Sequence, residues 1–159
     1  MAKLHTLDFE EEVDYKLICL HTTLEDYRLA YFINEKLNLS LKRRDEDLDF
    51  KETGSTFSLY EYYDKSFFLT YNLIANKHLD VAFKTSKKNA LFYNTLLSET
   101  KISYLINDKK KVDYFFKITG DVSLQQINCI LDKLNSIDQV ITSYATSPEN
   151  IKQNAHLIF

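Results

Sequence analysis

A strand pattern followed by a helix pattern occurs twice in this chain, and this repeated unit most limits the folds that the chain can adopt. The first unit runs from VDYKLICL at 13–20 into a helix over about 23–38, and the second runs from VDYFFKIT at 112–119 into a helix ending near 136. Both strand segments are mostly apolar, and both helix segments carry apolar residues at helical spacing. Two such units predict helices that bury one face against a sheet.

Each predicted helix has a start signal and an apolar stripe. Thr22 and Glu25 have the spacing of a capping box, which satisfies free amides at a helix start, and the same spacing recurs at Ser123 and Gln126. The stripes expected to face the sheet are Leu24, Tyr27, Ala30, Tyr31 and Leu37 in the first helix and Leu124, Ile127, Ile130, Leu131 and Leu134 in the second. They match in register after one inserted residue in the turn. Either a structural duplication or chance explains the match, because any two amphipathic helices can be aligned.

The region between the two units predicts further strands. Three segments there are rich in Phe, Tyr, Thr and Leu, and they are 47–52, 55–65 and 66–76. They predict an antiparallel meander, whereas residues 77–111 fit no single pattern. A strand at 138–146 and a short terminal helix from Ser147 complete the chain. The order predicts one α+β domain over 1–159, a ferredoxin-like or ACT-like sandwich with an antiparallel sheet, helices on one face and an insertion.

Composition excludes several classes of protein. With 159 residues, 45% of them hydrophobic, the chain is long enough for one core, and its net charge of -3 does not favour bulk attraction to nucleic acid or anionic membrane. Cys19 and Cys129 form no disulfide pattern, which fits a cytoplasmic protein. Neither an export signal nor a membrane span is expected from the sequence.

The sequence lacks the motifs of the common enzymes. Two glycines cannot form a Gly-rich phosphate loop. Asp45, Asp47 and Asp49 have the rhythm of a calcium loop, but Phe50 and Thr56 stand where its glycine and glutamate belong. The histidines show no metal-ligand spacing; they are His5, His21, His78 and His156. We therefore expect no catalytic residue, cofactor or metal, and a non-enzymatic protein.

Three sets of residues are candidates for contact with other molecules. On the wheel, Leu29, Phe32 and Ile33 lie on the outer side of the first helix, where a partner or the chain's own insertion would cover them. Lys109, Lys110 and Lys111 form a basic cluster that fits either RNA contact or a solvated turn. The third set is a possible ligand or turn site at the strand-to-helix turns and consists of His21, Thr22, Asn34, Gly120 and Asp121.

Two of these sets have further features. Asn34 falls within the apolar stripe, so its amide is expected to bond the backbone of an irregular strand or, alternatively, a ligand. Two more basic clusters, at 42–44 and at Lys84 with 87–88, accompany the lysines of 109–111. With Tyr60, Tyr62 and Tyr63 on nearby strands, the clusters would form an RNA-binding face.

The segment INDKKKVDY at 106–114 resembles the signature of the IPExxxVDY family of uncharacterised Bacteroidota proteins. Asn107 stands where the family has Pro, and Asp108 stands for its Glu. The strand and first helix, NLIANK at 72–77 and the ending SPENIKQNAHLIF are also similar to the family. The resemblance implies no activity, cofactor or catalytic residue.

These observations leave three functions open. The leading expectation is a cytoplasmic interaction or regulatory module that self-associates through the first helix or a sheet edge. The alternatives are an RNA- or ribosome-associated accessory protein and an ACT-like sensor of a small metabolite.

Overall fold

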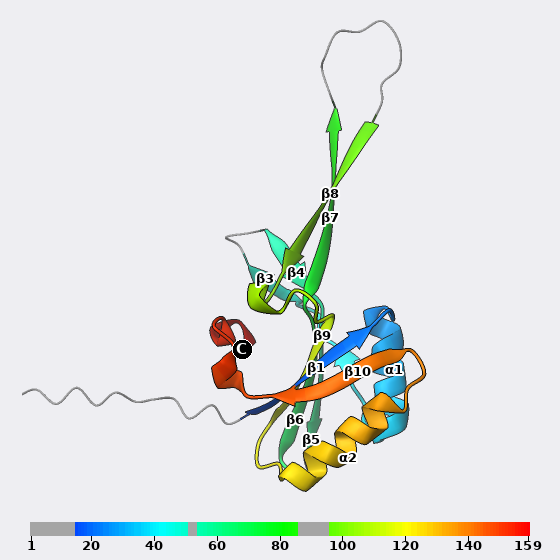
Figure 1. The fold of residues 1–159 in the computed structure, drawn as a ribbon, viewed down its shortest axis with the longest axis vertical. Coiled ribbons are helices and arrows are strands. Elements are labelled where there is room, and N and C mark those ends of the chain that lie inside the picture. The colour runs from blue at the N-terminus through cyan, green and yellow to red at the C-terminus, as the bar shows by residue number, and fades with distance from the viewer. Residues whose placement is uncertain (1–14, 51–53, 86–95) are drawn as a thin grey trace, which may run out of the picture.

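The computed structural model describes residues 15–50, 54–85 and 96–159 (Figure 1). The elements are β1 (Tyr15–Thr22), α1 (Asp26–Leu37), β2 (Lys42–Arg43), β3 (Leu48–Phe50), β4 (Ser55–Phe57), β5 (Leu59–Asp64), β6 (Leu69–Ala75), β7 (Lys77–Thr85), β8 (Leu96–Tyr104), β9 (Tyr114–Thr119), α2 (Leu124–Asn135) and β10 (Val140–Thr146). Short 3₁₀ turns are η1 (Asn107–Lys109), η2 (Pro148–Asn150) and η3 (Asn154–Leu157). The mixed α+β class that the sequence predicts is confirmed.

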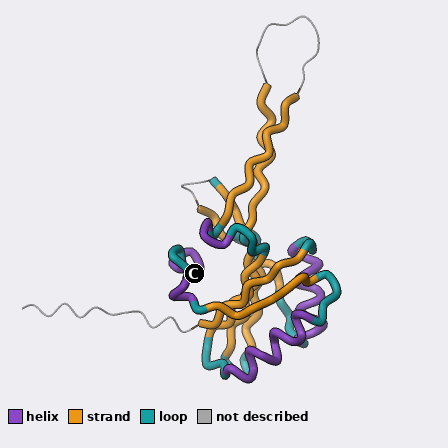
Figure 2. Tube along the Cα trace, in the orientation of Figure 1, coloured by secondary structure: helices purple, strands orange, loops and turns teal. Residues whose placement is uncertain are grey.

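The main sheet has six strands in the order β10-β1-β9-β6-β5-β2, and its neighbouring strands are antiparallel. Figure 2 shows α1 and α2 together on one side of this sheet, with the C-terminal turns on the other. Strands β3 and β4 form a separate small pair, and β7 and β8 form another. The meander predicted before residue 77 is present as the hairpin of β5 and β6.

Both faces of the sheet are buried, because the central strands alternate between two apolar clusters. In β1, Leu17 and Cys19 belong to the cluster beneath the C-terminal turns, whereas Ile18 and Leu20 face the helices. This alternation follows from the two-residue side-chain period of a strand. Lys117 interrupts it in β9, where its side chain is buried among apolar neighbours of the C-terminal side.

The assignment of the first helix's faces from the sequence was wrong in part. Leu24 and Ala30 of the predicted stripe are buried in the core and Leu37 packs against it, but the two tyrosines of the stripe are exposed. Leu29 and Ile33 are fully buried against the sheet, whereas Tyr27 and Tyr31 are 60% and 65% exposed. The physical reason is that α1 begins at Asp26. Leu24 precedes the helix and has no place on its wheel. Without Leu24, the stripe that packs on the sheet is centred on residues that the sequence analysis placed on the outer side of the helix. Leu29, Phe32 and Ile33 are therefore not a partner interface, because Leu29 and Ile33 belong to the core and the half-buried Phe32 packs against it.

The two helices begin in different ways. The capping box predicted for α2 is present, since the Ser123 hydroxyl accepts from the Gln126 amide while the Gln126 side chain accepts from the Ser123 amide. The box predicted for α1 is absent, because its N-cap is Glu25 and makes no side-chain cap. The Thr22 hydroxyl instead accepts from the amide of Leu24 and donates to a carbonyl of the α2–β10 turn.

The two strand–helix units correspond in the structure, but not in the register that the sequence indicates. One constant difference in residue number aligns the N-cap of α1 with that of α2 and aligns buried residues of one unit with buried residues of the other. The pairs at this offset are Glu25 with Ser123, Leu24 with Val122, and Leu29 with Ile127. The repeated tripeptides then differ by one residue, and a one-residue shift reverses the face of a strand. Tyr15 accordingly lies in the C-terminal-side cluster and Tyr114 in the helix-side cluster, while Val13 and Asp14 lie outside the described residues.

Strands β7 and β8 form a two-stranded arm that projects from the rest of the molecule (Figure 1). Their pairing runs from Lys77 with Tyr104 at the root to Thr85 with Leu96. The root packs on β4 through an edge-to-face contact between Phe57 and His78, whose ring centroids are 6.1 Å apart. The arm covers most of residues 77–111, which fit no single pattern in the sequence.

Candidate functional site

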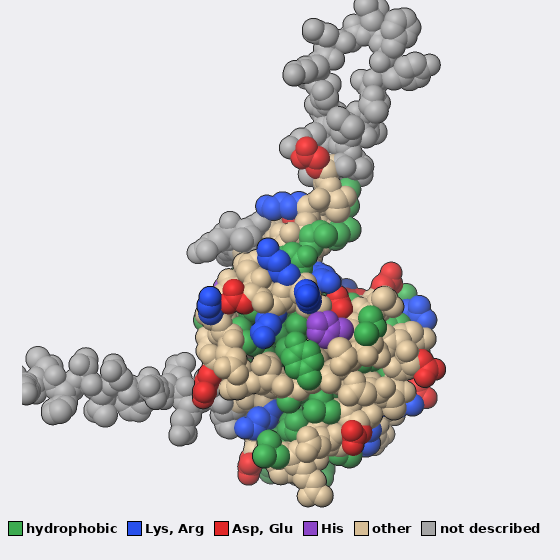
Figure 3. All heavy atoms as spheres, in the orientation of Figure 1, with side chains coloured by type: hydrophobic (Ala, Val, Ile, Leu, Met, Phe, Trp, Pro, Cys, Tyr) green, Lys and Arg blue, Asp and Glu red, His purple; other side chains and the backbone are tan. Residues whose placement is uncertain are grey.

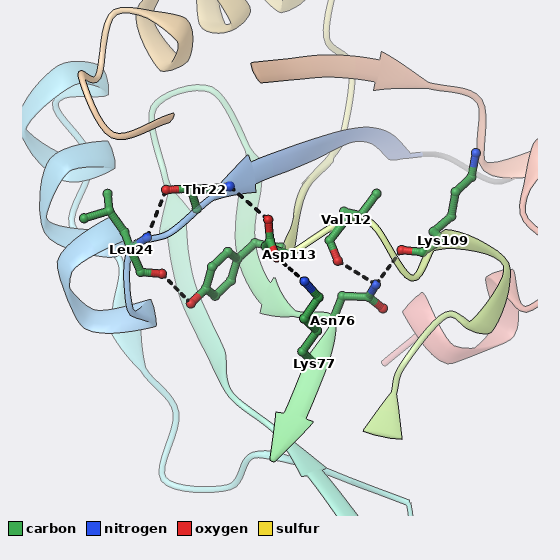
Figure 4. A network of polar contacts seen from close by, with 8 residues as sticks. Thr22, Leu24, Asn76, Lys77, Lys109, Val112 and Asp113 are labelled. Atoms are coloured by element: carbon green, nitrogen blue, oxygen red, sulfur yellow. Dashed lines mark hydrogen bonds and ion pairs between the residues drawn. The ribbon is translucent and has the colours of Figure 1, made fainter. Parts of the chain in front are cut away.

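The Val-Asp-Tyr segment that precedes and opens β9 joins three parts of the chain (Figure 4). The Asp113 carboxylate accepts from the backbone N–H of Thr22 at 3.0 Å and forms an ion pair with Lys77 at the root of the arm. The Tyr114 hydroxyl donates to the carbonyl of Leu24 at 2.9 Å. Burial raises the pKa of Tyr114 most, and the negative charge of Asp26 raises it further, so the phenol stays protonated. This segment therefore fixes the β1–α1 turn and the arm root.

Asn76 holds the loop before this segment. Its buried side chain donates to the carbonyls of Lys109 and Val112, both at 2.9 Å, and accepts from the amide of Ile106 at 2.9 Å. The loop is tied from the other side by the amide of Asn107, which donates to the Gln153 side chain at 2.7 Å. The backbone of 106–112 is thus held at both ends and in the middle. A solvated turn would not need such support.

The same loop lines a pocket of about 360 Å³, here called the basic pocket, whose walls are 107–112 and Tyr144 of β10. Among the described residues, no carboxylate pairs with Lys109, Lys110 or Lys111, and their surroundings offer one acid, Asp108, in the pocket wall. The Lys110 ammonium lies 5.6 Å from the centre of the Tyr104 ring, in a cation–π contact. Figure 3 shows basic side chains gathered beside a histidine on this face.

The aromatic wall of the basic pocket is held in place from below. Tyr144 stacks on His21, with ring centroids 5.7 Å apart and an angle of 22° between the planes. Its hydroxyl is hydrogen-bonded to the Cys19 thiol, whose pKa is raised chiefly by burial. The thiol is therefore protonated at neutral pH and serves as a partner for Tyr144, not as a nucleophile. A fixed ring and unpaired ammonium groups suit an anion that carries a planar group.

A second pocket, of about 400 Å³, lies between the start of α1 and the root of the arm. Its charged groups are largely committed to one another. The Arg43 guanidinium donates two hydrogen bonds to the Asp47 carboxylate, at 2.7 and 3.2 Å, and lies 3.8 Å from the Asp26 carboxylate. Lys77 forms its ion pair with Asp113. The Asp47 contact also raises the pKa of Arg43. These pairs connect α1, the β2–β3 turn and the arm, so we assign this pocket a structural role.

The possible ligand residues at the two strand-to-helix turns do not form one site. Thr22 ends β1 and Gly120 follows β9, and these antiparallel strands pair Tyr15 with Thr119, so the turns lie at opposite ends of the sheet. Asp121 is exposed beside Gly120. His21 is the member of this set that the structure brings to the basic pocket, through its stack on Tyr144.

Asn34 has the structural role that the sequence favours. Its side chain donates to the Leu41 carbonyl at 3.1 Å and accepts from the Leu41 amide at 2.8 Å, so it pairs with the backbone just before β2. Asn135 of α2 does the same to Ser143 of β10, accepting from its amide at 2.8 Å. Each helix therefore binds the backbone of an edge strand through one asparagine near its C-terminus.

The other elements of the predicted RNA-binding face do not assemble. Tyr60 is buried and Tyr62 stacks on Tyr71, whereas Tyr63 is 49% exposed, so the three tyrosines offer no common stacking surface. Arg43 and Arg44 are paired with acids. The side chains of Lys84 and of 87–88 lie outside the described residues. Of the two basic clusters whose side chains the structure describes, the one at 109–111 has no member in an ion pair.

No family model matches the chain, and no curated protein or solved structure matches it. The described residues contain no group of three or more His, Cys, Asp or Glu side chains that could hold a metal ion. In the described part of the chain, neither helix has the length and apolar character needed to cross a membrane.

The sequence analysis missed the residues that build the basic pocket around its lysines. Asn76, Gln153 and Tyr144 come from three distant segments, and none has a local pattern that marks it. Three segments that the sequence analysis quoted nevertheless meet here, 72–77, 106–114 and the C-terminal ending. The Asn76 side chain donates to the Lys109 carbonyl, and the Gln153 side chain accepts from the Asn107 amide.

Proposed function

We propose that this protein is a non-enzymatic interaction module that self-associates through the apolar face of its β7–β8 arm. The observation that carries the proposal is a set of exposed apolar side chains on one face of a two-stranded ribbon. Leu79, Val81 and Ile102 are 60%, 48% and 50% exposed. Leu79 is paired with Ile102, and Val81 lies two residues from Leu79, so all three share a face.

An isolated ribbon of two strands is marginally stable in water, because it has no second layer on which to bury its apolar face. Strand layers pack about 10 Å apart when their apolar faces meet. A second arm supplies such a layer and presents the same apolar residues. Residues 77–81 and 99–104 carry two lysines, Lys77 and Lys101, and two acids, Asp80 and Glu99. Their formal charges cancel, so two copies of the arm do not repel each other strongly.

Two finer features belong to the same proposal. The order β10-β1-β9-β6, with α1 after β1 and α2 after β9, supports a ferredoxin-like core to which β5 and β2 are added at one edge. A cytoplasmic location is supported by the exposed free thiol of Cys129, because such thiols persist in reducing compartments. Membership of the IPExxxVDY family stays a prediction.

Sedimentation equilibrium of the complete chain tests the proposal. We expect the mass of two chains for the wild type and of one chain for the double variant Leu79→Lys/Ile102→Lys, with the thermal midpoint of the body nearly unchanged. Leu124→Lys is the matched control, because Leu124 is 77% exposed on α2, away from the arm. It should leave the mass at two chains.

A wild type that stays at the mass of one chain up to about 100 µM would contradict self-association. Its Kd would then lie above about 100 µM, and its free energy of association would be weaker than about −5.5 kcal/mol. Equal effects of the arm variant and the Leu124 control would show that the arm is not the interface. A partner from the native host that is recovered only without nuclease treatment would favour the RNA-associated alternative.

A further inference from the structure

We propose that the basic pocket binds a nucleotide, with Lys109, Lys110 and Lys111 holding its phosphate and Tyr144 contacting its base. The phosphate-bearing ligand is either a free nucleotide or a nucleotide within single-stranded RNA, since both present the same groups. The residues that line the pocket, 107–112 and Tyr144, do not include the exposed apolar residues of the arm, so the proposal does not rest on self-association.

Charge is the first reason. The positive groups elsewhere on the described surface that belong to basic clusters are largely neutralised: Arg43 by Asp47, and Arg44 by Glu61 at 3.8 Å. In the wall of the basic pocket three lysines outnumber the single carboxylate, Asp108. Ammonium groups without a carboxylate partner lose little when a phosphate approaches, because no ion pair has to be broken. Lysine is an ordinary phosphate ligand as a point charge.

Rigidity is the second reason. Binding costs less when the groups are already in place, because fewer side chains and loops are ordered at that moment. Asn76 fixes the carbonyls of Lys109 and Val112, and Gln153 fixes the amide of Asn107. Within the loop, the amide of Val112 donates to the carbonyl of Lys109 at 2.9 Å. The three lysines therefore start from a fixed backbone, and only their side chains remain to be ordered.

The aromatic wall is the third reason, and it selects a nucleotide over a bare anion. Tyr144 lines the pocket and is 38% exposed, so part of its ring is open to a ligand. Its other contacts, with His21 and Cys19, hold the ring in one position. Base–aromatic stacking is tolerant of sequence and adds to backbone electrostatics in single-strand binders. A volume of about 360 Å³ lies within the range of small-ligand pockets.

Fluorescence anisotropy with a labelled single-stranded RNA, and competition by AMP and by inorganic phosphate, test the proposal on the complete chain. We expect RNA binding to weaken by at least about tenfold between about 50 mM and about 200 mM salt. Replacing the three lysines with Gln should weaken binding by at least about tenfold and lower the salt slope by roughly 2, given about 0.7 per neutralised phosphate. Tyr144→Leu should weaken RNA and AMP by about tenfold but leave phosphate competition unchanged.

The matched control carries the same change of net charge at exposed lysines that do not line the basic pocket: Lys36→Gln in α1, Lys133→Gln in α2 and Lys65→Gln in the β5–β6 turn. It should bind like the wild type. Competition by AMP at concentrations near its own Kd identifies a nucleotide pocket, and binding of RNA without competition by AMP identifies a strand of RNA as the ligand. The proposal is overturned by absence of binding to every probe, by equal losses in the two triple variants, or by binding of phosphate alone.

Discussion

Asp113 and Thr22 are joined by a 3.0 Å hydrogen bond from the backbone N–H of Thr22 to the Asp113 carboxylate, which links the start of β9 to the end of β1. Thr22 is 5% exposed and this hydrogen bond is part-buried, so removal of the carboxylate leaves the amide with little access to water. We expect Asp113→Ala to lower the free energy of unfolding by about 1–3 kcal/mol, the cost of a buried donor without a partner. Urea unfolding measures this loss of stability, and Asp108→Ala, a change at an exposed aspartate, is the control. Equal effects of the two changes would contradict it.

The corrected faces of α1 give the second prediction. Ile33 is fully buried against the sheet, so Ile33→Ala should lower the free energy of unfolding by about 2–5 kcal/mol. Tyr31→Ala removes a larger side chain that is 65% exposed, and it should cost less than about 1 kcal/mol. Urea melts of the two variants decide between the faces, since the sequence-based wheel predicts the reverse order.

This error shows what a helical wheel requires. Apolar and aromatic residues occur on every side of the first helix, so the choice of its first residue determines which face is selected. Starting about three residues too early brought Leu24 into the stripe and drew in Tyr27 and Tyr31, whose rings can be exposed because each has a polar end. The second helix has a cleaner polar face and a true capping box. Its predicted stripe is buried or half-buried except at Leu124, which begins the helix and is 77% exposed.

The strands were predictable because alternation and β-rich composition are local properties. The arm and the basic pocket were not, because they depend on contacts between distant segments. Nothing local distinguishes Asn76 from a turn residue, yet its side chain spans to Lys109 and Val112. Asn34 was predictable for the opposite reason, since an amide within an apolar stripe must find a partner wherever the stripe lies.

The third prediction concerns the glycines. Gly120 has φ +119, and a Cβ there would lie 2.8 Å from Leu69 Cδ2 and 3.0 Å from the Phe68 carbonyl oxygen. Gly120→Ala should therefore cost more than about 1 kcal/mol, because strain and a close contact act together. Gly54 has φ +66 with open space around it, so Gly54→Ala should cost less. Thermal midpoints give the order, and a larger loss at Gly54 would show that the contact at Gly120 relaxes freely.

Lys117 gives the last prediction, which is one of pH dependence. Lys117 is 6% exposed. Its ammonium donates to the Leu157 carbonyl at 2.6 Å and lies 4.9 Å from the centre of the Tyr15 ring and 4.3 Å from that of Phe159. Burial lowers the pKa of Lys117 below its ordinary 10.5. The folded protein therefore releases this proton at a lower pH than the unfolded chain does.

Between the two pKa values the unfolded chain binds more protons, so the contribution of Lys117 to stability rises with pH in the window just below 10.5. Lys117→Met lacks this contribution, while the buried tyrosines titrate in both proteins. We expect the difference in unfolding free energy between wild type and variant to move in favour of the wild type between about pH 8 and about pH 10. Urea melts at the two pH values measure it. A difference that is constant or moves toward the variant would show that the folded protein does not lower the pKa of this lysine.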